Sequence, residues 1–280
     1  MDIQALVTLS VPLFIFAATV CRIFEDPQWD PVESLAGIFA HRGNGSQLDG
    51  TYLPVLNRIL DNQNEKQKNQ LIREFREVVG TLVVLESPLS IFSLSRLTGL
   101  SERLINLRLN SLNSIIHIPE RKEIPLRLFH LSFRDFLIDP ESRNKTPLWV
   151  DKNEAHEKLT SQCLSTCSDL KRNICGLPSD GTLRSDIDPH IVSCCLPPEL
   201  QYSCRFWAQH LAQSQDSISD SLMLDVLMFL QHHFLHWMEA MSILGLASEL
   251  VRIVDLLLQT VTLVGSCLDH DSIPVLTDIG

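Results

Sequence analysis

The eleven residues 127–137 constrain the fold of this chain more than any other segment. They begin as a short apolar strand and continue with the spacing of an amphipathic helix, in which Phe133 and Phe136 face a core. Ser132 is placed to cap this helix. His130 lies at its first turn, where unpaired backbone N–H groups and the helix dipole favour an anion. The segment therefore predicts a strand-to-helix corner that offers His130 to a phosphate.

The composition favours helices packed on helices. Of the 280 residues, 45% are hydrophobic and 20% are charged, which suffices for buried cores. Leucine dominates, aromatic residues reach only 6%, and runs of β-branched residues are sparse. We therefore expect a mainly α fold with many helices: a winged-helix domain that carries a small β-hairpin, followed by a helical domain.

A helix-turn-helix followed by a hairpin is expected near the middle of the chain. Apolar residues recur at helical spacing over 75–83, and Pro88 breaks that run. Ser101 is a good N-cap for the second helix of the pair. Two short apolar strands, 115–118 and 126–129, then flank a charged turn. This order predicts a winged helix.

Further helices are expected on both sides of that region. Asp49-Gly50 is interpreted as a break that separates short helices from one over 51–60. Beyond residue 150 helical periodicity returns, and Pro198 marks the start of one helix. The helices expected there span 152–170, 198–213, 219–240 and 241–264.

Several motifs in a fixed order resemble one family. The sequence L-F-H-L-S-F-R-D-F at 128–136 is similar to the F-x-H-x-S-F-x-E/D-F segment in the winged helix of NACHT-type (STAND) signalling NTPases. Segments 170–175, 200–211 and 234–241 look like stretches of the fungal heterokaryon-incompatibility class, in which a helical region joins the NACHT module to a WD-repeat propeller. The likeness extends over roughly 10–265.

The resemblance implies a domain order and two nucleotide contacts. Residues 1–24 correspond to the last helix of a NACHT core whose sheet is absent, and His130 and Pro12 correspond to residues that contact the β-phosphate and the adenine of ADP. In this chain we expect both contacts to be vestigial. The remaining regions are a small helical domain (25–65), the winged-helix domain (66–150), a C-terminal helical domain (151–265) and a tail (266–280).

The residues that would bind and hydrolyse a nucleoside triphosphate are missing from the sequence. Its best glycine-rich run, 43–46, is not followed by Lys-Ser/Thr, and no apolar strand ends in paired acidic residues. We therefore expect no enzymatic activity and no cofactor, with ADP or ATP bound only if a NACHT core completes the site. The expected function is that of a cytoplasmic regulatory or scaffold fragment that packs on protein partners, either copies of itself or intact NACHT relatives.

Other kinds of chemistry are disfavoured by spacing. Eight cysteines without a clear secretory signal are typical of reduced thiols, and none forms a C-x-x-C pair. His232 and His236 share a helix face, but no glutamate lies between them as in H-E-x-x-H metalloproteases. We therefore predict no metal site and no catalytic residues.

Two alternative functions remain open. The helix-turn-helix carries Arg103 and Arg108 on its second helix, as a DNA-binding protein would, although residues 65–108 hold only seven basic against five acidic residues. The net charge of −11 and the pI near 5.3 also disfavour nucleic acid as a partner. The apolar run 5–24 permits a membrane anchor, which Asp2 and Pro12 disfavour.

Overall fold

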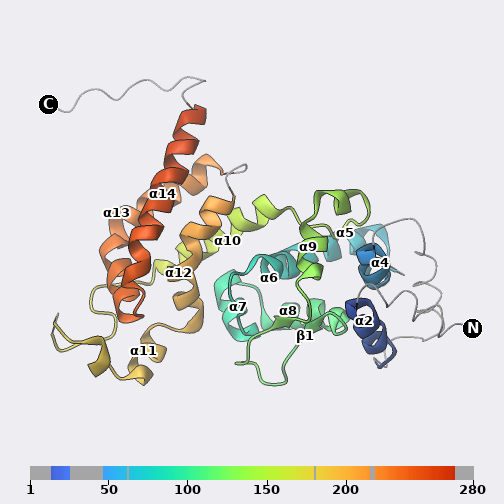
Figure 1. The fold of residues 1–280 in the computed structure, drawn as a ribbon, viewed down its shortest axis with the longest axis horizontal. Coiled ribbons are helices and arrows are strands. Elements are labelled where there is room, and N and C mark those ends of the chain that lie inside the picture. Colours follow the sequence, from blue (N-terminus) through green and yellow to red (C-terminus); the bar gives the residue numbers. More distant parts are fainter. Residues whose placement is uncertain (1–13, 26–46, 62, 180, 215–217, 269–280) are drawn as a thin grey trace, which may run out of the picture. The chain divides into compact units, whose positions relative to one another are not determined.

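The structure is a computed structural model that describes residues 14–25, 47–61, 63–179, 181–214 and 218–268. Over these ranges the chain is mainly helical, with one small two-stranded sheet (Figure 1). It divides into two compact units, Met1–Lys152 and Asn153–Gly280. Pro12 and most of the region 25–46 lie outside the described residues.

The first unit consists of short helices around a hairpin. Contacts join the N-terminal helix α2 to α4, α4 to α9, and α7 to α8. The elements, in chain order, are α2 (Phe14–Glu25), α4 (Gln47–Leu60), α5 (Glu65–Phe75), the π-helical η1 (Arg76–Gly80), α6 (Thr81–Val84), α7 (Ile91–Thr98), α8 (Glu102–Leu109), η2 (Asn110–Leu112), β1 (Ile116–His117), β2 (Arg127–Leu128), α9 (Ser132–Ile138) and η3 (Pro140–Asn144).

Polar side chains define where these helices begin and end. Asn64 caps α5 through a capping box with Gln67. Ser90 and Ser101 each accept a hydrogen bond from a backbone N–H in the first turn of α7 and α8. Gly99 ends α7 with φ of 72°, a backbone conformation that other residues rarely adopt. The predicted cap at Ser101 is therefore confirmed.

The hairpin is shorter than expected but is extended by a further backbone contact. β1 and β2 pair antiparallel, with Ile116 opposite Leu128. The Leu126 N–H donates to the carbonyl of Leu89 at 2.9 Å, and Ser90 forms an isolated bridge with Pro125. These contacts join the hairpin to the segment that precedes α7.

Helix α4 begins earlier than the sequence pattern indicated. Asp49 and Gly50, predicted to break the chain, lie inside α4. The Asp49 carboxylate is buried and pairs with Lys145 Nζ at 3.0 Å. An acidic residue in the first turn also suits the helix dipole, so the prediction of a break here was wrong.

The second unit is a helical bundle in which α12, α13 and α14 contact one another. Figure 1 shows α13 and α14 as its two long helices, coloured orange to red. Its elements are α10 (Lys152–Cys167), η4 (Arg184–Asp186), α11 (Pro189–Cys195), α12 (Pro198–Gln213), α13 (Asp220–Ile243) and α14 (Ala247–Leu268).

Several boundaries in this unit differ from the predictions: α10 ends at Cys167 instead of residue 170, and α14 runs from Ala247 to Leu268 instead of over 241–264. α13 continues to Ile243, past the expected end at residue 240, and the chain turns at Gly245 with φ of 76°. α12 has the predicted bounds.

Trp207 and Trp237 lie edge to face, with ring centroids 5.6 Å apart, at the centre of the core. No helix within the described ranges combines the length and apolar character needed to cross a bilayer.

Candidate functional site

His130 lies at the surface between the hairpin and α9. Its ring is exposed, and α9 begins two residues later, so the imidazole precedes the first turn instead of lying within it. The Nδ1 atom lies 2.7 Å from Ser132 Oγ and 3.1 Å from the backbone nitrogen of Ser132. Ser132 Oγ in turn lies 2.7 Å from the hydroxyl of Tyr52 on α4. The three side chains form one hydrogen-bonded chain.

The hydrogen bonds determine which ring nitrogen of His130 carries the proton. A backbone N–H can only donate, so Nδ1 of His130 is the acceptor in its contact with Ser132. The neutral ring therefore has its hydrogen on Nε2. This leaves a single N–H donor on the exposed side of the ring.

Tyr52 anchors the buried end of this chain. Its ring packs 5.2 Å from Phe133 and 5.5 Å from Phe136, measured between centroids. Burial raises the pKa of Tyr52, with Asp135 adding to that effect and the hydrogen bond to Ser132 opposing it. The hydroxyl thus stays protonated and donates to Ser132, whose own hydroxyl is left to donate to His130.

Ser132 has a different role from the one expected. The N-cap of α9 is Leu131, which has no side-chain cap hydrogen bond, whereas the Ser132 hydroxyl is engaged by Tyr52 and His130. The prediction of a serine cap was wrong because a residue 80 positions away competes for the same oxygen. Phe133 and Phe136 are buried, as predicted.

A cation lies against the residue that precedes the histidine in the chain. The Arg22 guanidinium of α2 stacks on Phe129, 3.8 Å from its ring centroid, and this ring directly precedes His130 in the chain. Arg22 Nη1 is buried, and no described residue accepts a hydrogen bond from it. Pro12, the other residue implied by the family resemblance, lies outside the described residues.

One of the two arginines noted on the predicted DNA-reading helix, which is α8, is engaged in an ion pair. Arg108 Nη2 lies 2.7 Å from Glu74 Oε2, and both side chains are largely buried. Asn106 donates to the carbonyl of Glu102 within its own helix. Arg103 is exposed. Of the two arginines noted in the sequence, one is thus held in an intramolecular ion pair.

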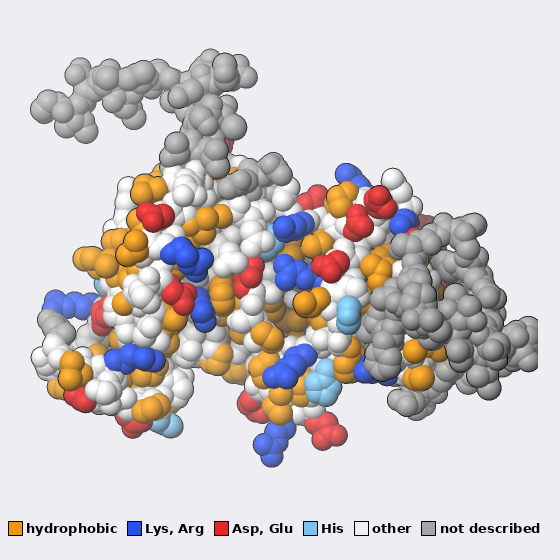
Figure 2. All heavy atoms as spheres, in the orientation of Figure 1, with side chains coloured by type: hydrophobic (Ala, Val, Ile, Leu, Met, Phe, Trp, Pro, Cys, Tyr) orange, Lys and Arg blue, Asp and Glu red, His pale blue; other side chains and the backbone are white. Residues whose placement is uncertain are grey.

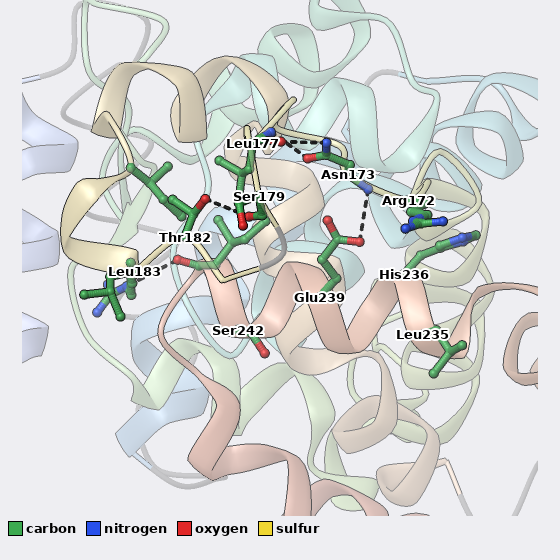
Figure 3. Close-up of a pocket in the computed structure, with 13 residues that line it drawn as sticks. Arg172, Asn173, Leu177, Ser179, Thr182, Leu183, Leu235, His236, Glu239 and Ser242 are labelled. Atoms are coloured by element: carbon green, nitrogen blue, oxygen red, sulfur yellow. Dashed lines mark hydrogen bonds between the residues drawn. The ribbon is translucent and has the colours of Figure 1, made fainter.

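The second unit contains a hollow that sequence reasoning missed. It encloses about 580 Å³ between α13 and the segment before α11 (Figure 3). Glu239 of α13 points toward Asn173 and accepts its backbone N–H at 3.1 Å, and Asn173 has the unusual φ of 51°. Its lining includes Arg172, Asn173, Leu177, Leu183, His236 and Glu239.

The histidines of α13 bond mainly to the backbone. The Nδ1 atoms of His232 and His233 lie 2.8 Å and 3.1 Å from the carbonyls of Met228 and Leu170. His236 Nδ1 is buried without a hydrogen-bond partner among the described residues. Over the same residues, no group of three or more His, Cys, Asp or Glu side chains has an arrangement that would hold a metal ion.

Two buried clusters form the polar interior of the second unit. His156 and His210 meet through their Nδ1 atoms at 2.9 Å, and Tyr202 contacts His210 Nε2 at 2.7 Å. Cys167 and Cys204 have sulfur atoms 4.0 Å apart. Burial raises the pKa of Cys163 to about 12, and burial together with Cys204 raises that of Cys167. Neutral buried thiols are poor nucleophiles and poor metal ligands.

The features of the two units described above are the exposed His130 with its Nδ1 held by Ser132, a hollow with a mixed lining, and two buried clusters. Nothing in the sequence pattern signalled Tyr52 or the pair of buried histidines, because their partners are distant in the chain. No protein-family model, no curated protein and no solved structure matches this chain.

Proposed function

We propose that this chain is a non-enzymatic regulatory or scaffold segment of a NACHT-type signalling NTPase, which acts by packing on protein partners. The observation that carries the proposal is the exposed Nε2–H of His130, fixed in direction by Ser132. In the family that the chain resembles, a histidine at this place contacts the β-phosphate of ADP. A single outward donor suits a phosphate oxygen supplied by a separate nucleotide core.

The order of elements around His130 supports a winged helix. A capped helix pair, α7 and α8, is followed by the β1–β2 hairpin and then by α9. The hairpin is the wing in this reading, and α8 occupies the place of the second helix of a helix-turn-helix. DNA binding is the weaker alternative because Arg108 is engaged by Glu74.

The surface beside His130 supports a protein partner. Leu131 is 68% exposed, and Phe129, on the other side of His130 in the chain, is also an exposed large apolar residue. Apolar side chains grouped with a polar donor are typical of interaction sites. The proposed partner is a NACHT nucleotide core or another copy of the chain.

The proposal predicts no turnover by the chain alone. Phosphate release from magnesium ATP should stay at the buffer rate, since the sequence has no G-x-x-x-x-G-K-S/T loop to hold the phosphates. Turnover by the purified chain that is abolished by His130→Ala would refute the non-enzymatic proposal.

The regulatory part is tested with the nucleotide core of a NACHT-type NTPase loaded with fluorescent ADP. Adding the chain should slow ADP release, because the lid histidine would add a hydrogen bond to the phosphate. His130→Ala should lose the effect, whereas His190→Ala, an exposed histidine on α11 in the second unit, should retain it. Equal release rates with and without the chain would contradict the proposal.

A further inference from the structure

Helix α13 is apolar on both sides, but the bundle covers only one of them. Val226, Phe229 and Trp237 belong to its buried face, which packs on α12 and α14. A helix that is hydrophobic all round is normally buried all round. In this structure the second face is open to solvent.

The open face carries a stripe of large apolar side chains. Its first member is Leu224. Leu227 and Met228 lie three and four residues after Leu224, and Leu235 lies seven residues after Met228, so all four share one side of the helix. All four are exposed, and Leu235 is 75% exposed. Figure 2 shows hydrophobic side chains gathered over this part of the second unit. We call these four residues the α13 stripe.

The stripe is bordered by two hollows. One, of about 420 Å³, lies between α10 and α13 and is lined by Asp225, Met228 and His232. The other is the hollow of Figure 3, which includes Leu235 in its lining. A ridge flanked by hollows fits the side chains of another helix.

We propose that the stripe binds the α13 stripe of a second copy of this chain, with the two helices antiparallel about a twofold axis. This inference rests on the proposed function, of which it names the self-association surface. If the axis passes midway between Met228 and Gln231, Leu224 of one copy faces Leu235 of the other. The stripe is thus complementary to itself, as a twofold interface requires.

The charges favour the same arrangement. Asp225 and His232 lie on one edge of the stripe, where both line the smaller hollow. The twofold axis brings Asp225 of each copy close to His232 of the other. His232 Nδ1 donates to the carbonyl of Met228, so the doubly protonated ring is the form in which Nε2 supplies a second N–H to that carboxylate. Two equivalent pairs then fix the antiparallel direction.

The test is analytical ultracentrifugation of the full chain over a concentration series. The wild type should show a reversible equilibrium between monomer and dimer. The double variant Leu224→Glu and Leu235→Glu should raise the dissociation constant at least about tenfold, because two negative charges then face each other across the interface. Leu107→Glu, an exposed leucine on α8, is the control and should leave the dimer intact. Circular dichroism checks that every variant is folded.

A charge exchange tests the direction of the helices. Asp225→Lys should weaken the dimer, because a cation then faces His232 of the other copy. Adding His232→Glu in the same chain should restore it. This rescue is expected only if the two side chains meet between copies, as the antiparallel arrangement requires.

Three results would overturn the inference. They are a monomeric wild type at all concentrations, a dimer that persists in the Leu224 and Leu235 double variant, and a charge exchange without rescue. Sedimentation with phosphatidylcholine and phosphatidylserine vesicles that depends on Leu235 would assign the stripe to a lipid surface instead. Turnover of ATP would remove the proposed function without affecting the dimer, so the two failures are distinguishable.

Discussion

The hydrogen-bonded chain from Tyr52 through Ser132 to His130 joins a core to the surface. Tyr52 packs against the ring of Phe133, and Ser132 forms hydrogen bonds both with the Tyr52 hydroxyl and with the exposed imidazole of His130. The orientation of the His130 ring therefore depends on Tyr52 and Ser132, neither of which contacts Nε2. An exposed histidine without such support would sample several ring orientations.

Ser132→Ala should remove the hydrogen bonds through which the serine hydroxyl links Tyr52 to His130. The variant leaves the Tyr52 hydroxyl without its partner, and we expect a loss of about 1 kcal/mol in the free energy of unfolding measured with urea. Nitrogen NMR of the imidazole should still show the Nε2–H form, because the backbone N–H at position 132 continues to donate to Nδ1. Ser111→Ala, at an exposed site in η2, is the control and should change neither quantity. An unfolding free energy equal to the wild-type value in Ser132→Ala would contradict the assigned chain.

The raised pKa of Cys163 predicts a loss of stability in alkali. The folded state holds this thiol neutral up to about pH 12, whereas in the unfolded chain it ionises near the ordinary value of 9.0. Its contribution is complete below pH 9 and is lost as the pH rises toward 12, because ionisation then favours unfolding. Cys163→Ala should flatten the fall of unfolding free energy across this range. Cys194→Ala, an exposed thiol, should leave the slope unchanged.

Individual residues were predictable where their partners are local. Ser101 was identified as an N-cap because its acceptor role lies within three residues of the chain. Ser132 was misread as a cap because Tyr52, far away in the sequence, takes up its hydroxyl. The outward direction of the His130 ring depends on the same distant contact.

Two glycines show how an element's surroundings determine the effect of a methyl group. In α4, a Cβ on Gly50 would meet nothing within 4 Å, so Gly50→Ala should stabilise the protein by about 0.5–1 kcal/mol through helix propensity. In η1, a Cβ on Gly80 would lie 3.3 Å from Val150 Cγ1. Gly80→Leu should therefore destabilise by about 1–3 kcal/mol.

Thermal unfolding followed by circular dichroism measures both changes. The midpoint should rise for Gly50→Ala and fall for Gly80→Leu. Equal shifts in the two variants would show that the packing of Val150 against η1 does not limit this position.

Elements were predictable where periodicity and caps agree. α12 has the bounds that its prolines and apolar spacing indicated. α11 was missed because it is only seven residues long and none of its residues is buried. The π-helical turn η1 also escaped prediction, since an inserted residue inside a helix leaves the apolar pattern almost unchanged.

Each of the two units has its own core, which leads to a prediction for the whole molecule. Leu109 is fully buried in the first unit, and Trp237 is fully buried in the second. Leu109→Ala should cost about 2–5 kcal/mol in the first unit. With Trp29 and Trp149 of the first unit replaced by phenylalanine, tryptophan fluorescence reports the second unit, so its midpoint should stay at its value in that background while the helical signal shows an earlier transition. Coincident early transitions would show that the units unfold together.

The overall character of the molecule was predictable only in outline. Leucine content and apolar spacing indicated a mainly helical chain with a small hairpin, and the structure has both. The hollow near Asn173 and the buried contact of His156 with His210 arise from packing between segments that are distant in sequence. No local pattern encodes them.

Cysteine is distributed very unevenly between the two units. Cys21 is the single cysteine before residue 153, and the other seven all follow it, from Cys163 to Cys267. When heat opens the second unit, air oxidation can cross-link its many sulfur atoms in wrong combinations and trap them. The first unit has no second thiol of its own with which Cys21 could form a disulfide. After a heating and cooling cycle without reductant, the N-terminal half should therefore regain its fold while the C-terminal half stays aggregated.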